Sequence, residues 1–275
     1  MVKPTFLFWL SVALSSVVSA APAQRIVSLV PHATEMLFAI DAGERVIAVD
    51  ESSDYPAPAN QLPKVANYRS LNVEQILALA PDLIVVWDSA QRQQVQPLAQ
   101  LGIPVFYSEP QNFAALADEL VALSELTGTQ QQAAAVVAQY QQELADLTVD
   151  YAEAKPISVF YQIASSPLMS ANNTTWMGQA IELCGGVNIM GNSPAPYPQV
   201  NAEQVLAQDP KVIVAGNSED LQRWQQWPAL TAVANKQLLT IDTNLLNRFT
   251  TRTPQGIRTL CQQLDKARVL TELGR

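Results

Sequence analysis

Two segments of this chain repeat each other, and the repeat constrains the fold more than any other feature. The first, NVEQILALAPDLIVVW, starts at Asn72, and the second, NAEQVLAQDPKVIVAG, starts at Asn201, 129 residues later. In each, the Asn can cap a helix, the Gln three residues on completes a capping box, and a one-sided apolar run follows. A Pro then ends the helix, and a continuous apolar stretch has the composition of a buried strand. The chain therefore carries two copies of one helix–strand unit.

The elements around this unit recur in the same order. Buried strands are predicted at RIVSLVP and ISVFYQI, helices from Thr34 and Thr175, short strands at RVIAVD and GVNIMG, and last strands at IPVFYSE and QLLTIDT. A further helix follows each last strand. Strands that alternate with helices favour parallel sheets covered on both faces. We expect an α/β fold with two Rossmann-like lobes, residues 24–127 and 156–275.

A long helix is predicted between the lobes, over residues 128–155. After its opening Gly this stretch has no Gly or Pro, and it is rich in Ala and Gln. A single helix of about 24 residues is about 36 Å long at roughly 1.5 Å per residue. Such a helix, joining two lobes, is rigid and allows little hinge closure. An ordinary surface helix within one domain is the alternative, and the matched repeats on either side favour the linker.

The first residues read as a secretory signal, which predicts export to the periplasm of a Gram-negative bacterium. Residues 1–20 have Lys3, then an apolar run, then small residues before a cleavage point after Ala20 or Ala23. The apolar run is short for a membrane span. The whole chain has a net charge of −9 and no basic run, which argues against nucleic acid and anionic membrane surfaces.

Cysteine and histidine usage argues against a metal site built by the protein. Cys184 and Cys261 are the two cysteines, and in an oxidising compartment such a pair favours a structural disulfide. Closing a 77-residue loop stabilises by roughly 4 kcal/mol on a chain-entropy argument. His32 is the single histidine, so no His-based zinc cluster is expected. It is either a hydrogen-bonding group at a helix start or an axial ligand to the metal of a bound pigment.

Ligand-binding residues are expected in the loops that follow the strands, because ligands of open α/β sheets sit beyond the carboxyl ends of the strands. Flat aromatic rings from four such loops suit a large planar or macrocyclic ligand, although some rings can instead pack against their own loops. The candidates are Tyr55, Tyr68, Trp87 and Tyr197, with His32 and the loop residues Asn244, Leu245, Leu246, Asn247 and Arg248.

These stretches together resemble a known family. SLVPHATE, SDYP, the block from Asn72, ELCGGVNI, PYPQVNAEQVLA and TLCQQL are similar to the cobalamin-binding periplasmic proteins. These belong to the helical-backbone class of solute-binding proteins, which also includes siderophore and haem binders. In the last cleft loop the family often has Trp-Phe before an Arg, where this chain has Leu245-Leu246-Asn247-Arg248.

The resemblance implies what such a protein does. It implies a corrinoid, cobalamin or cobinamide, carried in the cleft as cargo, with no cofactor, and delivery to an ABC importer in the inner membrane. It implies that aromatics matching the four candidates line the cleft and that the matched cysteines are bonded. It also implies that Glu74 and Glu203, one on each lobe, dock on arginines of the permease dimer. Their local alternative is a favourable interaction with the helix macrodipole.

Two other functions stay open at this point. A haem or ferric-siderophore carrier of the same fold is the alternative within the binding class. An enzyme is disfavoured, because the sequence has no G-x-S-x-G elbow, no P-loop and no dinucleotide fingerprint. We therefore expect a monomeric, soluble carrier that returns its ligand unchanged.

Overall fold

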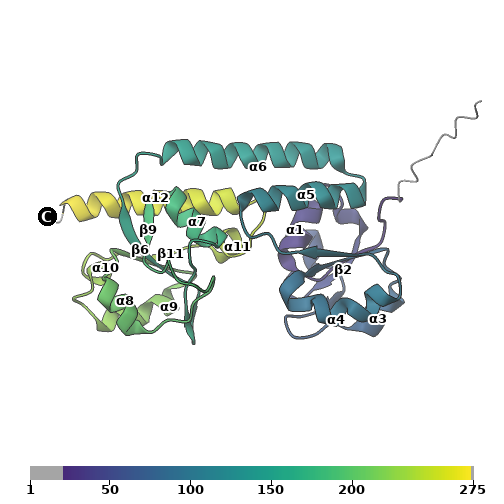
Figure 1. Cartoon of the computed structure of the whole chain (residues 1–275), viewed down its shortest axis with the longest axis horizontal. Helices are drawn as coiled ribbons and strands as arrows, with labels where there is room; N and C mark the ends of the chain where they lie inside the picture. The colour runs from purple at the N-terminus through teal and green to yellow at the C-terminus, as the bar shows by residue number, and fades with distance from the viewer. Residues whose placement is uncertain (1–20, 274–275) are drawn as a thin grey trace, which may run out of the picture.

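The structure, a computed structural model, describes residues 21–273 and shows two α/β lobes side by side under one long helix (Figure 1). The N-terminal lobe lies on the right of Figure 1 and the C-terminal lobe on the left. The predicted signal segment, residues 1–20, lies outside the described residues. The predicted α/β fold, with two lobes joined by a long helix, is confirmed.

The N-terminal lobe is built on a five-stranded sheet in the order β3-β2-β1-β4-β5, with parallel pairings throughout. Apolar side chains are buried on both faces, so helices must cover both. The strands are β1 Ile26–Ser28, β2 Val46–Asp50, β3 Lys64–Ala66, β4 Leu83–Trp87 and β5 Val105–Ser108. The helices are α1 Pro31–Ala39, η1 Gly43–Arg45, α2 Ala57–Asn60, α3 Val73–Ala78, α4 Asp88–Gln100 and α5 Phe113–Thr127.

The C-terminal lobe has a four-stranded parallel sheet in the order β11-β10-β6-β9, and β7 and β8 form a separate antiparallel pair. Its strands are β6 Ile157–Gln162, β7 Ala164–Ser165, β8 Leu168–Met169, β9 Gly186–Asn188, β10 Val212–Ala215 and β11 Leu238–Thr240. Its helices are α7 Trp176–Leu183, α8 Ala202–Gln208, α9 Ser218–Gln222, η2 Arg223–Gln226, α10 Thr231–Ala234, α11 Thr243–Leu246 and α12 Thr253–Leu273.

The internal repeat is visible in the strand orders. The spatial order β2-β1-β4-β5 in the N-terminal lobe corresponds to β9-β6-β10-β11 in the C-terminal lobe. In both lobes the strand of the repeated unit lies between the first and the last strand. The N-terminal lobe adds β3 at its edge. The carboxyl ends of corresponding strands therefore present loops in corresponding places.

The helix starts of the repeat are capped differently. Asn201 completes the predicted capping box, since its Oδ1 accepts from the Gln204 N–H at 2.8 Å and its own N–H donates to Gln204 Oε1 at 2.9 Å. Asn72 caps α3 through Oδ1, but the second predicted hydrogen bond of the capping box, from the Asn72 N–H to the Gln75 side chain, is wrong. The Asn72 N–H already donates to the Val65 carbonyl at 2.8 Å, so Gln75 accepts from the Asn72 side-chain amide instead.

Helix α6, Gln130–Asp150, connects the lobes with 21 residues, somewhat shorter than the predicted stretch. Gly128 ends α5 in the left-handed region at a φ of 69°, which lets the chain reverse sharply into α6. Along α6, Tyr140 is buried in the core of the N-terminal lobe and Leu147 in that of the C-terminal lobe. One helix is thus anchored in both cores, which resists rotation of one lobe against the other.

The predicted disulfide is present. Cys184 at the end of α7 is bonded to Cys261 within α12, with a Cα–Cα distance of 4.8 Å. Both residues are fully buried in the C-terminal core. Across residues 21–273, no helix is long and apolar enough to cross a membrane.

Candidate functional site

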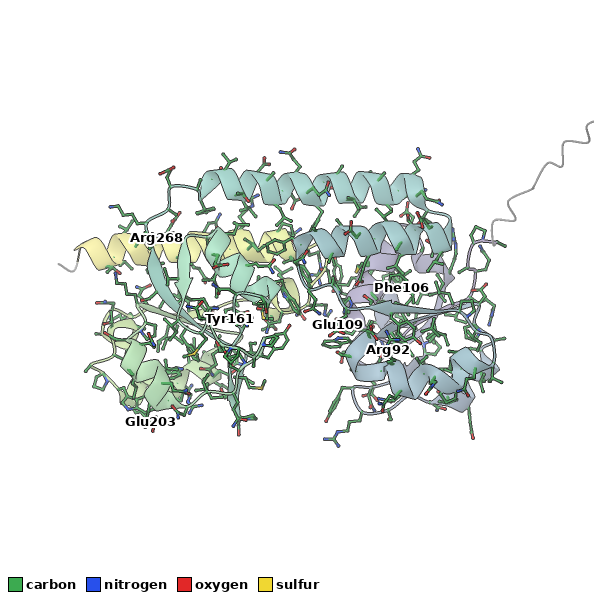
Figure 2. The ribbon with its side chains drawn as sticks, in the orientation of Figure 1. Arg92, Phe106, Glu109, Tyr161, Glu203 and Arg268 are labelled. Atoms are coloured by element: carbon green, nitrogen blue, oxygen red, sulfur yellow. A yellow bond between two sulfur atoms is a disulfide. The ribbon has the colours of Figure 1, made fainter. Side chains whose placement is uncertain are left out.

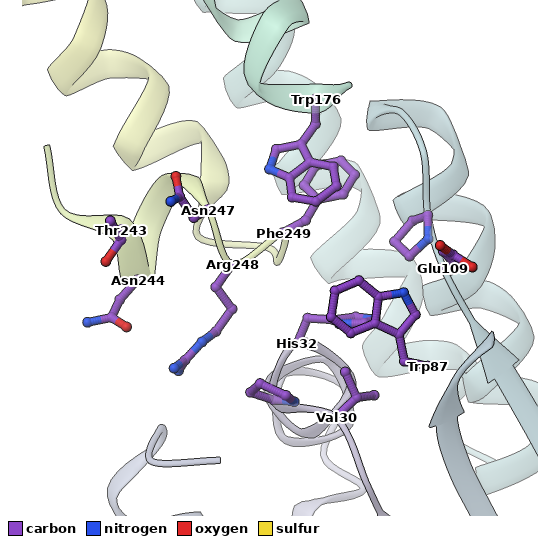
Figure 3. A pocket seen from close by; sticks show the side chains of 12 residues that line it. Val30, His32, Trp87, Glu109, Trp176, Thr243, Asn244, Asn247, Arg248 and Phe249 are labelled. Carbon is purple, nitrogen blue, oxygen red and sulfur yellow. The ribbon is translucent and has the colours of Figure 1, made fainter. Parts of the chain in front are cut away.

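A pocket of about 290 Å³ lies between the lobes and is lined by both (Figure 3). The N-terminal lobe contributes residues at or just after the carboxyl ends of β1, β4 and β5, as expected for an open α/β sheet. The C-terminal lobe contributes the start of α7 and the segment that follows β11. The lining residues are Val30, Pro31, His32, Trp87, Glu109, Pro110, Trp176, Thr243, Asn244, Asn247, Arg248 and Phe249.

Aromatic rings from the two lobes form the apolar part of the pocket. Trp176 and Phe249 are stacked, with ring centroids 4.9 Å apart and an interplanar angle of 2°. The Trp176 indole is fixed by its Nε1–H, which donates to the Leu246 carbonyl at 2.8 Å. Trp87 comes from the other lobe and keeps 41% of its surface exposed. The pocket therefore offers flat apolar surface from both sides to one ligand.

The polar candidates line this pocket, but of the four predicted aromatic rings only Trp87 does. Trp87, His32, Asn244, Asn247 and Arg248 line the pocket. Tyr197 lies at the edge, with its ring 6.3 Å from that of Trp176.

The remaining candidates lie elsewhere. Tyr55 lines a neighbouring hollow, where the Arg252 guanidinium lies 3.7 Å from its ring centroid. Tyr68 is 82% exposed and contacts Arg69. Leu246 is buried in the C-terminal core and Leu245 is half-buried; neither lines the pocket, because the turn of α11 directs Asn244 and Asn247 there instead.

Seven of the twelve lining residues were not among the candidates, and three of these seven carry an aromatic ring or a charge. Trp176 directly follows Thr175, the cap of α7, so the predicted helix start already placed it after a strand. Phe249 stands one position after the candidate loop, and Glu109 directly follows the predicted strand IPVFYSE at β5. The rule that strand-end loops face the ligand, applied to the residue after β5, would have identified Glu109. Nothing in the sequence indicates that Phe249 stacks on Trp176.

His32 is connected to a buried carboxylate through a serine. Its Nε2 lies 2.7 Å from Ser108 Oγ, and Ser108 donates to Glu119 Oε2 at 2.5 Å. Glu119 also accepts from the Glu109 N–H at 2.9 Å. Burial raises the pKa of Glu119, and these hydrogen bonds oppose the rise. Burial, with a smaller contribution from the charge of Arg248, lowers the pKa of His32 to about 4, so the ring is neutral at pH 7.

An ion cluster bridges the lobes next to the pocket. The carboxylate of Glu35, on α1, is 2% exposed and accepts from two arginines of the C-terminal lobe. Its oxygens lie 3.0 Å from Arg248 and 2.6 and 2.8 Å from Arg252. Arg248 also donates to Asp54 at 2.6 Å, and this hydrogen bond lowers the pKa of Asp54. The charge of Arg248 is thus matched by two carboxylates of the N-terminal lobe.

Glu74 and Glu203 are both exposed in the first turns of α3 and α8. These two helices lie on the same side of the molecule, one in each lobe and opposite to α6 (Figure 1). Figure 2 shows Glu203 at the outer face of its lobe, away from Glu109, which faces the space between the lobes. Each lobe therefore carries one exposed carboxylate on a helix of this common side.

The fold and the pocket define the class of a two-lobed binding protein, with a pocket between lobes that one helix connects. The match with known proteins is more specific. Residues 26–245 match the family model described as periplasmic binding protein, and the chain belongs to this family. The predicted periplasmic location is confirmed at the level of the family.

Relatives and solved structures agree with this assignment. The chain is 38% identical over 267 residues to the vitamin B12-binding protein of Vibrio cholerae serotype O1, and the matched region covers 96% of each chain. It is 35% identical over 250 residues to the vitamin B12-binding protein of Yersinia pestis, covering 89% of this chain and 88% of the other.

Among solved structures, the periplasmic vitamin B12 binding protein of Vibrio cholerae superposes with a TM-score of 0.83 at 38% identity, covering 90% of this chain and 98% of the other. The periplasmic haem-binding protein of Vibrio cholerae shares the fold, with a TM-score of 0.76 at 23% identity, covering 88% and 98% of the two chains.

Proposed function

We propose that this protein captures a corrinoid, cobalamin or cobinamide, between its lobes and delivers it to an ABC importer in the inner membrane. One observation supports this most: aromatic rings from both lobes, Trp87 on one side and stacked Trp176 and Phe249 on the other, converge on one pocket. The relatives that cover nearly the whole chain bind vitamin B12. The lobes of this carrier are residues 24–127 and 156–275, joined by 128–155.

The chemistry of the pocket suits an amphipathic macrocycle. The rings offer flat apolar surface, and each buries roughly 150–250 Å² when covered. Asn244 is exposed, and its side-chain amide can donate to and accept from the amides at the periphery of a corrin. A volume of about 290 Å³ is at the low end of ligand pockets, which run from roughly 300 to 1,000 Å³. A corrinoid therefore extends beyond the pocket toward Tyr197. In this proposal it also reaches toward Tyr55 and Tyr68, whose side chains lie outside the pocket.

The proposal makes the protein a carrier and not an enzyme. The corrinoid is cargo and no cofactor is required, so the ligand is released chemically unchanged. The carrier acts as a monomer, because the permease dimer needs one contact on each lobe. Equilibrium dialysis tests this: cyanocobalamin recovered from the complex is expected to have its original mass and spectrum.

Glu74 and Glu203 are the proposed docking residues. Each is exposed on the repeated helix of its lobe, and the two helices, α3 and α8, lie on the side of the molecule opposite to α6 (Figure 1). Carboxylates in these places steer the protein toward a partner with complementary positive charge, such as permease arginines. The matched spacing across two lobes fits a partner with two equivalent subunits.

The binding experiment uses calorimetry with cyanocobalamin and, separately, haemin. We expect Trp87→Ala and Trp176→Ala each to weaken cyanocobalamin binding by roughly 1–3 kcal/mol, the scale of a buried interface aromatic. Leu101→Ala, at an exposed site outside the pocket, serves as control and is expected to bind like the unmodified protein. Tighter binding of haemin than of cyanocobalamin would favour the haem carrier instead.

A further inference from the structure

The pocket carries one charge that no opposite charge matches. Glu109 and Arg248 are the charged side chains that line it, since His32 is neutral. Arg248 is paired with Glu35 and Asp54. Within residues 21–273, Glu109 has no cation in an ion pair, and it accepts only from the N–H and hydroxyl of Ser89, at 3.0 and 2.7 Å. A carboxylate has about four lone-pair positions, so Glu109 keeps acceptor capacity for a ligand.

The hydrogen bonds of His32 leave its other ring nitrogen as an acceptor. Ser108 has one hydroxyl proton and donates it to Glu119 Oε2, while Glu119 Oε1 accepts from the Glu109 N–H. Ser108 Oγ must then accept from His32, so the imidazole proton is on Nε2 and Nδ1 carries the lone pair. Among the described residues Nδ1 has no hydrogen-bond partner, and the atom is not fully buried.

His32 and Glu109 lie on the same side of the pocket. Both come from the N-terminal lobe and line the pocket with Trp87, whose ring meets that of His32 edge-on with centroids 6.2 Å apart (Figure 3). The two residues also share Glu119, which accepts from the Glu109 backbone and holds Ser108 against His32. A ligand stacked on Trp87 therefore places its edge toward groups that accept hydrogen bonds and carry negative charge.

We propose that His32 Nδ1 and the Glu109 carboxylate form an acceptor wall that selects corrinoids with peripheral primary amides over those with carboxylates in the same positions. The inference rests on the proposed function. A primary amide brings two N–H donors to this wall at no electrostatic cost. A carboxylate brings none, and its charge is repelled by Glu109 in a partly desolvated place. The same reasoning disfavours the propionates of haem.

The experiment compares cyanocobalamin with its monocarboxylic acids, in each of which one peripheral amide is hydrolysed, by calorimetry at pH 7.5. For the unmodified protein we expect at least one acid to bind about ten-fold or more weakly than cyanocobalamin. The readout is this ratio of affinities. In Glu109→Gln, which keeps an acceptor but removes the charge, the ratio is expected to fall toward one. Glu125→Gln, which removes an exposed carboxylate away from this pocket, is expected to keep it.

His32 is tested separately. His32→Phe retains a ring but has no acceptor, and we expect it to weaken cyanocobalamin binding several-fold. His32→Asn, whose Oδ1 takes the place of Nδ1, is expected to recover part of that loss, and it serves alone if the Phe variant fails to fold. The visible spectrum of bound aquocobalamin is expected to be the same in both variants and the unmodified protein.

Three results would overturn the inference. The first is equal affinity of the unmodified protein for cyanocobalamin and every acid. The second is an unchanged ratio in Glu109→Gln. The third is a cobalt spectrum that depends on His32, which would make the residue an axial ligand and not an amide acceptor. If cyanocobalamin itself does not bind, the proposed function fails, which is a distinct outcome.

Discussion

Replacing Glu35 with Gln is expected to destabilise the protein by about 3 kcal/mol. Glu35 is the shared partner of Arg248 and Arg252, and its carboxylate is 2% exposed. Breaking a buried ion pair by removing one partner costs about 3–5 kcal/mol, because a buried charge is left unmatched. Arg248 retains Asp54, and the two guanidinium groups are 14% and 19% exposed, so water offsets part of the loss. Because Asp54 and water offset part of the loss, the expected destabilisation lies at the lower end of the range of about 3–5 kcal/mol.

The measurements are equilibrium unfolding in urea, since an ionic denaturant would screen the charges, and thermal unfolding. For a domain of about 150–250 residues, each kcal/mol shifts Tm by roughly 2–4 °C, so Glu35→Gln is expected to lower Tm by roughly 6–12 °C. Asp54→Asn is the matched control. Its carboxylate is 53% exposed, and the loss is expected to stay below about 1 kcal/mol. A Glu35→Gln loss no greater than that of Asp54→Asn would refute the reasoning that the buried cluster ties the lobes together.

Three further predictions concern other parts of the molecule. Replacing Cys184 and Cys261 with Ala is expected to cost roughly 4 kcal/mol in urea unfolding, because the bond closes a 77-residue loop; two free thiols in native protein would contradict the bond. Since the pKa of His32 falls from 6.5 to about 4 on folding, its neutral form stabilises fully above pH 6.5, and this contribution is lost as the pH falls toward 4; His32→Asn is expected to lack that part of the pH dependence. Lys in place of both Glu74 and Glu203 is expected to abolish most vesicle uptake while leaving ligand affinity near normal, and full uptake would make them helix-start residues only.

Local signals in the sequence predicted the main strands and helices of each lobe and their order, but not β3, the pair β7–β8 or the short helices. Asn72 and Asn201 cap α3 and α8 where the repeat places them, and the apolar strands after them lie centrally in their sheets. These features depend on residues close in the chain. The second half of the capping box at Asn72 failed because Val65, from a neighbouring strand, takes the backbone N–H.

The pocket shows what local signals cannot reach. The sequence brought Trp87, His32 and Arg248 forward as candidates because each follows a strand or lies in a long loop. It did not indicate that Phe249 stacks on Trp176, or that Glu35 binds arginines more than 200 positions away, at sequence separations of 213 and 217. The stack depends on how the C-terminal lobe folds, and the ion pairs depend on how one lobe sits against the other; no short segment encodes either.

The sequence by itself determined the two α/β lobes, the long connecting helix and the pair of cysteines, because periodicity, caps and composition act over a few turns or strands. Tertiary structure alone decided which strand-end side chains meet. Helix α6, buried in one core at Tyr140 and in the other at Leu147, fixes the two lobes against each other. That fixed placement brings Trp87 opposite Trp176. Packing within the N-terminal lobe leaves Tyr68 exposed outside the pocket and sets His32 against Ser108, which donates to Glu119.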